Sequence, residues 1–425
     1  MQALLGIPIL LLAAWLAAEK RRPITWRVIL GGLFLQAIVG ILVLKVPVVR
    51  RLVEWVSKAF VRTLDFAHEG SEFLFGNLVR PEYAQTFGFI FVLQVLPTVI
   101  FFSALTAALY YLGLLQIVVR AVAWVMRRTL GTSGPESLCV ASNIFLGQTE
   151  APLLIRPFIG GLSRSELLAV MVGGMATLAG GVLAAYVGFL GGNDPVMRQK
   201  FALHLMAASV MNAPAALVLA KILLPESDPE AHQKPLVVSS ETSASNLLEA
   251  LAQGAADGVR LAANIAAMLL AFIATLALLN YLLLRLGDFL GLNPWIVQTT
   301  GALYEGLSLE WILGQIFRPI AWLIGVEWRE SLGVGALIGQ KVVINEFIAY
   351  TKLAEMSSLS EKARIISTYA LSGFANFSSI AIQLGGIGSL APHRRREIAE
   401  LGLRAVLGGT FASLLSACWA SILIG

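Results

Sequence analysis

The chain has 425 residues, of which 57% are hydrophobic and only 13% are charged, and its formal net charge is +5. Soluble domains carry about 25% charged residues, so this composition excludes an ordinary soluble protein and predicts a chain that crosses a membrane several times. The small positive charge indicates membrane orientation rather than nucleic-acid binding, because the basic residues gather at the ends of apolar segments.

Eight apolar segments have the length of membrane-spanning helices, which need roughly 20 residues. They cover residues 3–19, 27–47, 86–112, 165–190, 199–223, 260–284, 363–386 and 398–424. The first segment carries its basic residues after the apolar run, unlike a cleaved signal peptide, so we expect it to remain as the first span. Backbone in lipid must satisfy its own hydrogen bonds, and these helix-length blocks therefore predict an all-α polytopic membrane protein.

Amphipathic segments separate several of the spans. Residues 48–70 place apolar side chains on one helical face and charged ones on the other, which predicts a helix lying in the membrane interface. Residues 113–130 and 307–325 have the same character. Residues 225–245 contain three prolines and many polar residues, and they predict a solvent loop.

The orientation follows from Lys and Arg residues next to the spans. Basic clusters at residues 20–22, 120–128 and 394–396 fall on one side of the membrane if the eight spans alternate. Assigning that side to the cytoplasm places both termini in the periplasm. The basic residues of 50–62 fall on the other face and oppose this assignment.

Two apolar regions, residues 131–161 and 327–356, are interrupted by polar residues and glycines. Their pieces of about 10–14 residues are too short to cross a bilayer and predict two re-entrant hairpins. The stretches NIFLGQTEAPLL (143–154) and GQKVVINEFIAY (339–350) share Gly-Gln followed by Glu, and a span with a small, polar interruption follows each hairpin. This order predicts an inverted repeat with a site at its interface, the first hairpin entering from the cytoplasm and the second from outside.

Each hairpin contains an acid, Glu150 in the first and Glu346 in the second. A charge at bilayer depth costs roughly 2.5–3.5 kcal/mol, so we expect both side chains to meet polar partners instead of lipid. Backbone groups freed at hairpin turns can also bind a ligand. The residues by themselves predict a buried site for a neutral polar solute, with Na⁺ as a candidate ion.

Structural explanations remain open for many of these residues, since Ser, Thr and Asn join neighbouring membrane helices and Gly permits close packing. The histidines have no spaced companions that would indicate zinc. G-x-S-x-G, P-loop and H-E-x-x-H motifs are absent from the sequence, which argues against a membrane enzyme or an ATP-driven pump.

Three motifs make a family resemblance specific. GQTEAPLL (147–154), INEFIAY (344–350) and GFANFSSIAIQLGGIG (373–388), in this order, resemble the concentrative nucleoside transporter family, and the resemblance covers essentially the whole chain. It implies a bacterial Na⁺-coupled symporter, not an enzyme, that takes up uridine-like nucleosides across the cytoplasmic membrane. It also implies a homotrimer and an elevator-type movement.

The resemblance implies a division of the chain into a scaffold and a transport part. Residues 1–112 form the scaffold with its interfacial helix. Residues 113–223 form the first repeat of the transport part, residues 224–296 a linker and the sixth, scaffold helix, and residues 297–425 the second repeat.

The resemblance also implies the site, with the first hairpin and fourth span holding the nucleobase and the second hairpin and seventh span holding the ribose. The implied substrate-binding residues are Gln148, Thr149, Glu150, Val182, Glu346, Phe374, Asn376 and Ser379. The implied Na⁺ ligands are Asn143, the Leu146 carbonyl, Thr177 and the Leu178 carbonyl. Such neutral oxygens suit Na⁺ and not Zn²⁺ or Cu²⁺. The family often has Ser where this chain has Thr177, which keeps the oxygen, so we expect Na⁺ coupling.

Two alternatives remain. A proton-coupled symporter would use Glu150 or Glu346 to carry the proton. A nucleoside-binding membrane receptor or a channel would bind nucleosides without coupled transport, although the sequence shows no ring of like charges or filter-like carbonyl repeat.

Overall fold

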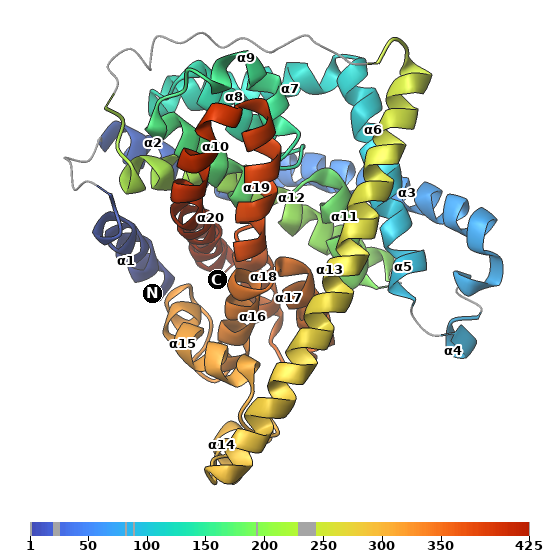
Figure 1. Cartoon of the computed structure of the whole chain (residues 1–425), viewed down its shortest axis with the longest axis vertical. Helices are drawn as coiled ribbons and strands as arrows, with labels where there is room; N and C mark the ends of the chain where they lie inside the picture. Colours follow the sequence, from blue (N-terminus) through green and yellow to red (C-terminus); the bar gives the residue numbers. More distant parts are fainter. Residues whose placement is uncertain are drawn as a thin grey trace.

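The computed structural model describes residues 2–19, 26–80, 83–87, 90–192, 194–227 and 244–424. Within these ranges every regular element is a helix, as the composition predicts (Figure 1). Most of the expected loop 225–245 and the basic cluster at residues 20–22 lie outside the described residues.

The expected spans fall on single helices or on pairs of helices. The single helices are α1 (Gln2–Leu16), α2 (Trp26–Lys45), α12 (Pro195–Leu223), α13 (Leu247–Phe289) and α20 (Arg395–Ile424). The pairs are α5 (Phe91–Gln94) with α6 (Leu96–Tyr111), α10 (Arg164–Ala176) with α11 (Gly180–Gly191), and α18 (Glu361–Leu371) with α19 (Phe377–Leu390). Helix α13 begins well before the expected residue 260, because polar residues in its first turns continue the helix outside the apolar block.

Six helical segments in the described part of the chain are long and apolar enough to cross a membrane. The expected first and seventh spans are not among them, since α1 has only 15 residues and the break after Leu371 divides the seventh into α18 and α19. Length and composition thus establish a multi-pass α-helical membrane protein with six such segments, where we expected eight spans.

The amphipathic segments form helices at the expected places. Helix α3 (Pro47–Phe75) starts with proline, whose fixed φ suits the first turn. Helix α7 (Leu114–Leu130) ends at Gly131, which has a left-handed φ of 74°. Helix α15 (Leu309–Leu323) is the third amphipathic helix. Two shorter helices, α4 (Ala84–Phe87) and α14 (Asn293–Thr300), lie in connections.

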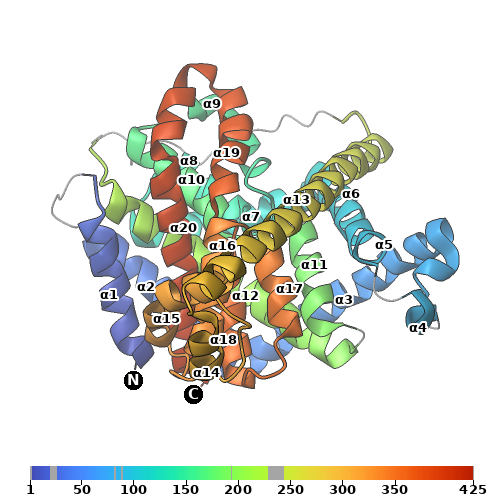
Figure 2. The same ribbon diagram turned by 60° about the horizontal axis from the view of Figure 1, so that its bottom comes forward.

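Both expected hairpins consist of helices too short to cross a membrane. The first contains α8 (Gly134–Ser142), a 3₁₀ turn at Ala151–Ile155 and α9 (Arg156–Ile159), and the second contains α16 (Ser331–Val343) and α17 (Glu346–Glu355). In both views the helices α8 and α9 of the first hairpin lie above α16 and α17 of the second (Figures 1 and 2). This placement is that of the predicted inverted repeat.

The packing of the helices repeats as well. Helix α10 packs on α8 and α12, and in the same way α18 packs on α16 and α20. The halves interlock because α10 also packs on α20 and α12 on α18. Helix α13 runs along α6 at the side of this core, and the termini lie close together (Figures 1 and 2).

Candidate functional site

The site is built where helices break. Helix α8 ends at Ser142, α10 ends before Thr177, α16 ends before Ile344, and α18 ends before Ser372. Backbone N–H and C=O groups lose their helical partners at such ends, and they persist at membrane depth only inside protein or beside a polar cavity. Hydrogen bonds and close contacts join these breaks to one another, as the following paragraphs describe.

The two broken helix pairs cross closely at Gly373. This residue has a φ of +99°, and a Cβ built on it would lie 2.3 Å from the carbonyl oxygen of Ala176 at the end of α10. Asn212 of α12 bridges the same point, because its amide donates to the Ala176 oxygen at 2.7 Å and to Ser372 Oγ at 2.8 Å. Only glycine allows both the backbone conformation and this approach.

We predict that Gly373→Ala lowers the stability of the protein and disrupts the crossing. The left-handed conformation would cost about 1–2 kcal/mol, and overpacking against Ala176 would add about 1–3 kcal/mol. The matched control is Gly385→Ala, since a Cβ there meets nothing within 4 Å. Melting of the purified variants in detergent measures the effect, and equal melting temperatures for the two would contradict this explanation.

Glu346 is the buried acid of the site, with 3% of its surface exposed at the start of α17. Its Oε1 accepts a hydrogen bond from the Tyr186 hydroxyl of α11 at 3.0 Å, and its Oε2 accepts one from Asn376 Nδ2 at 2.7 Å. Asn376 is fixed in turn because its Oδ1 caps α19 by accepting from the backbone N–H of Ser379 at 2.9 Å. The second hairpin, α11 and the break before α19 therefore meet at one carboxylate.

A chain of amides links the first hairpin to α19. Gln148 Nε2 donates to Ser379 Oγ at 3.2 Å, and Gln383 Nε2 donates to Gln148 Oε1 at 3.1 Å. Gln383 also donates to the Met171 carbonyl of α10 at 2.9 Å. Ser379 thus lies beside the N-cap residue that bonds Glu346 and also contacts Gln148. The predicted residues from both hairpins belong to one polar cluster through this serine.

The other predicted substrate residues differ in their burial and in their contacts. Val182 is buried and Phe374 is half-buried. The methyl group of Thr149 packs toward Gly386 of α19. Glu150 is exposed, with its carboxylate folded over Gly147. The expectation of burial holds for Glu346, whereas the side chain of Glu150 is exposed.

The predicted ion ligands lie between the end of α8 and the break after α10. Asn143 is 1% exposed, and its Oδ1 has no hydrogen-bond partner among the described residues. Thr177 is equally buried, and its hydroxyl donates to the Gly173 carbonyl at 2.9 Å, which leaves its lone pairs free to accept. The two breaks touch directly, since the Gly180 N–H donates to the Phe145 carbonyl at 3.2 Å.

The chemistry of these groups fits a hard monovalent cation. A buried oxygen without a donor is unfavourable by about 1–3 kcal/mol, and a cation would satisfy it. Leu146 and Leu178 are buried beside it and could supply carbonyl oxygens. No group of three or more His, Cys, Asp or Glu side chains that could hold a metal occurs in the described ranges, so a transition-metal site is not supported there.

Four polar residues of this region were not predicted from the sequence. Tyr186 and Gln383 lie within predicted spans, where a single polar side chain gives little signal. Ser209 of α12 donates to the Ile144 carbonyl at 3.2 Å beside the ion ligands. Asn212, described above, was also missed. A polar residue on a buried helix face was the only available sign.

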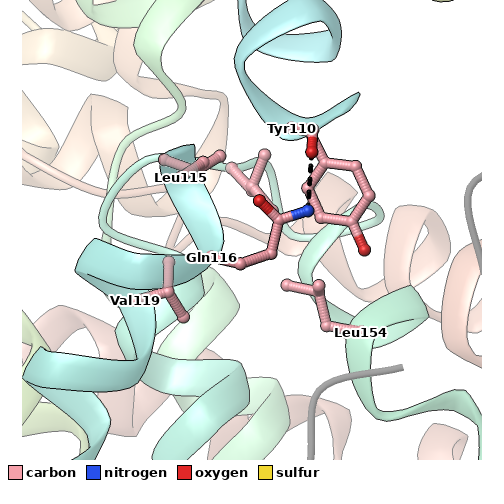
Figure 3. Close-up of a pocket in the computed structure, with 6 residues that line it drawn as sticks. Tyr110, Leu115, Gln116, Val119 and Leu154 are labelled. Carbon is pink, nitrogen blue, oxygen red and sulfur yellow. Dashed lines mark hydrogen bonds between the residues drawn. The ribbon is translucent and has the colours of Figure 1, made fainter. Parts of the chain in front are cut away.

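A small apolar pocket lies between the α6–α7 turn and the first hairpin. Figure 3 shows the Gln116 amide directed at the backbone oxygen of Tyr110, to which it donates at 2.6 Å. The pocket is lined by Tyr110, Leu115, Gln116, Val119, Leu146 and Leu154. Its lining offers few polar groups, so it marks a packing boundary of the first hairpin rather than a solute site.

Three family models match the chain. "Na+ dependent nucleoside transporter N-terminus" matches residues 5–78, "Nucleoside recognition" matches residues 92–193, and "Na+ dependent nucleoside transporter C-terminus" matches residues 204–421. Together they cover most of the chain, including both hairpins.

Similar proteins agree with these matches. "Uncharacterized transporter YutK" of Bacillus subtilis is 43% identical, over 99% of this chain and 98% of its own length. An "Uncharacterized transporter" of Haemophilus influenzae is 40% identical over 100% and 98%. "Sodium/nucleoside cotransporter 1" of Rattus norvegicus is 40% identical over 98% of this chain and 63% of its own length.

Solved structures resemble this fold along its whole length. "Structure of CNTnw in an inward-facing substrate-bound state" gives a TM-score of 0.89 at 39% identity and covers 100% of this chain and 97% of that chain. A variant of the same protein in an outward-facing state gives 0.89 at 38% identity.

Proposed function

Because this chain belongs to the concentrative nucleoside transporter family, we propose that it is a symporter that uses Na⁺ to take up uridine-like nucleosides. The membership confirms the family predicted from the three motifs and makes the chain a nucleoside transporter rather than an enzyme. The coupling ion, the choice of nucleoside, the movement and the oligomeric state are the proposed parts.

The observation that carries the proposal is the Glu346 carboxylate with its two donors, Tyr186 and Asn376. A buried carboxylate and an amide side by side can accept from and donate to the vicinal hydroxyls of ribose, and hydrogen bonds to a charged acceptor are strong. An analogue that lacks a hydroxyl would leave these buried groups unpaired, which disfavours its binding. Gln148, from the other hairpin, offers an amide to the polar edge of a base.

Na⁺ coupling is supported by the orphaned Asn143 oxygen beside Thr177. In the proposal the ion is held by Asn143, Thr177 and the carbonyls of Leu146 and Leu178. Bound there, it supplies positive charge that neutralises oxygen dipoles at the meeting of two broken helices. With the ion bound, Asn143 and Thr177 hold the first hairpin against the end of α10. This contact positions Gln148 for the base.

We further propose the elevator movement and the division stated above, with residues 113–223 and 297–425 moving against residues 1–112 and the sixth span. The interlocked packing of α10, α12, α18 and α20 supports a single moving unit. The movement must break contacts of α2, because Gln36 donates to the Met211 carbonyl at 3.2 Å and to Ser416 Oγ at 3.1 Å. A trimer is proposed from the family alone.

The proposed location is the bacterial cytoplasmic membrane with both termini periplasmic. Basic residues of several elements lie beside the end of α7 and beside Glu19, which follows α1. Arg27 of α2 donates to the Arg128 carbonyl at the end of α7. Arg164 and Arg404 both pair with Glu19. The positive-inside rule assigns the side with these basic residues to the cytoplasm.

The proposal is tested by uptake of radiolabelled uridine into proteoliposomes. With an inward Na⁺ gradient and a potential of −100 mV we expect accumulation above the external concentration, since one charge moving through that potential supplies about 2.3 kcal/mol, or about 50-fold. Replacing Na⁺ with choline should abolish accumulation. Accumulation driven by a pH gradient in Na⁺-free buffer would instead establish proton coupling. Binding without accumulation would indicate a receptor, and equilibration without a gradient dependence a channel.

A further inference from the structure

Lys341 is a fully buried cation in the first half of the second hairpin. It lies in α16, and its side chain is 0% exposed. Its Nζ donates to the Ala370 carbonyl at 2.9 Å, the Ser372 carbonyl at 3.2 Å and Ser413 Oγ at 2.7 Å. These groups belong to the end of α18 and to α20, so one amine joins three elements of the second repeat.

The three partners of the amine are all hydrogen-bond acceptors. Two are carbonyls, which only accept hydrogen bonds. The third, Ser413, uses its hydroxyl hydrogen to donate to the Thr410 carbonyl at 2.8 Å, so its oxygen accepts from Lys341. An ammonium has three hydrogens, one for each of these acceptors, and the arrangement therefore suits the charged form.

The first repeat has the same arrangement of elements, but no Lys or Arg among the described residues bonds Asn143 or Thr177 there. There, Asn143 stands at the end of the hairpin helix α8, Thr177 at the end of α10, and Ser209 on α12. In the second repeat, Lys341 lies near the end of the hairpin helix α16, Ser372 at the end of α18, and Ser413 on α20. In the first repeat the Asn143 oxygen has no partner among the described residues, whereas in the second the Ala370, Ser372 and Ser413 oxygens accept from the Lys341 amine.

The ammonium also supports the substrate side of the second repeat. The end of a half-helix carries roughly half a negative charge, which a cation stabilises. Lys341 holds the backbone at Ser372, where the break begins, and four residues later Asn376 bonds Glu346. Lys341 is therefore a positioning residue for the break.

We propose that the Lys341 ammonium is a built-in cation that does for the second broken helix what the coupling ion does for the first. The second repeat then needs no ion of its own, and the chain moves one Na⁺ with each nucleoside. This inference rests on the proposed Na⁺ coupling and adds the identity of the second cation.

The first test is the Na⁺-to-nucleoside ratio of the unmodified protein, measured from the membrane potential at which Na⁺-driven uridine flux reverses in proteoliposomes. We expect a ratio of one. A ratio of two, with uptake still Na⁺-driven, would overturn this inference while leaving the proposed function intact. The absence of any Na⁺-driven flux would be a failure of the proposed function instead.

The second test is the variant Lys341→Asn, which places an amide oxygen where the ammonium was and so copies the first repeat. We expect its melting temperature in detergent to fall in choline buffer and to rise with Na⁺ by at least twice the increase of the unmodified protein, and its ratio to become two. The change of melting temperature with Na⁺ is measured in detergent, so this test does not require that transport is coupled to Na⁺.

The matched control is Lys352→Asn, which removes an exposed lysine of the same hairpin that pairs with Glu355. We expect an unchanged melting response and ratio. A folded Lys341→Asn protein whose response to Na⁺ equals that of this control would overturn the inference. If Lys341→Asn fails to fold in either buffer, the ratio of the unmodified protein decides.

Discussion

Replacing the buried acid by its amide, Glu346→Gln, is expected to weaken uridine binding by about 10- to 100-fold and to abolish measurable uptake. A carboxylate accepts on both oxygens, and here both already face donors, Tyr186 and Asn376. Glutamine accepts on one atom only, so one of these donors would meet an N–H group. Hydrogen bonds to a charged partner are worth about 1.5–3 kcal/mol, which corresponds to the stated loss of affinity.

The matched control is Glu355→Gln at the other end of the same helix. Glu355 is well exposed and pairs with Lys352 at 2.9 Å, and such surface pairs contribute little. Calorimetry of uridine binding in detergent, together with uptake, separates the two variants. Binding by Glu346→Gln within twofold of the control would show that the carboxylate does not contact the nucleoside. Equal loss for uridine and for deoxyuridine would show that it does not read a ribose hydroxyl.

The arrangement of the spans and hairpins could be predicted because it depends on local patterns. Apolar blocks of the right length gave α2, α12 and α20 to within a few residues, and Gly-Gln-rich, polar interruptions marked both hairpins. The helical face pattern of residues 48–70 was sufficient for α3. Lengths were less secure, since α1 is shorter than its apolar run and α13 extends beyond its own.

The site could be predicted only in part, because its geometry depends on packing between distant segments. The motifs identified Glu346, Asn376 and Ser379, which hydrogen bonds do join. The role of Tyr186 could not be predicted, because its hydroxyl reaches Glu346 only through the packing of α11 against α17. Glu150 shows the converse limit: an acid in an apolar region was expected to be buried, yet its side chain is exposed.

Lys341 shows the same limit for charge. A lysine in an apolar hairpin half gives a visible signal in the sequence, but its partners lie on α18 and α20 and cannot be read from neighbouring residues. Two of those partners are backbone carbonyls, which exist as free acceptors only because α18 ends there. Backbone ligands of this kind carry no sequence signal, and the same holds for the proposed Leu146 and Leu178 carbonyls.

Removing the proposed ion ligand, Asn143→Ala, is expected to raise the Na⁺ concentration for half-maximal uptake by about tenfold or more. The estimate takes the loss of one charge-assisted contact as roughly 1.5 kcal/mol or more. The matched control is Ser142→Ala, the preceding buried residue, whose hydroxyl only bonds the Leu138 carbonyl of its own helix. Uptake at graded Na⁺ concentrations with constant ionic strength distinguishes the two variants.

Melting temperatures separate an ion ligand from a merely structural asparagine. Asn143 Oδ1 is buried without a partner, so in Na⁺-free buffer its removal relieves an unfavourable group, and Asn143→Ala should melt no more than slightly below the unmodified protein. In high Na⁺ the unmodified protein gains stability by binding the ion, and the variant should gain little, because ligand binding stabilises only the state that can bind. A structural asparagine would instead lower the melting temperature equally in both buffers. An Na⁺-induced increase of the same size in Asn143→Ala and in the unmodified protein would exclude this residue from the ion site.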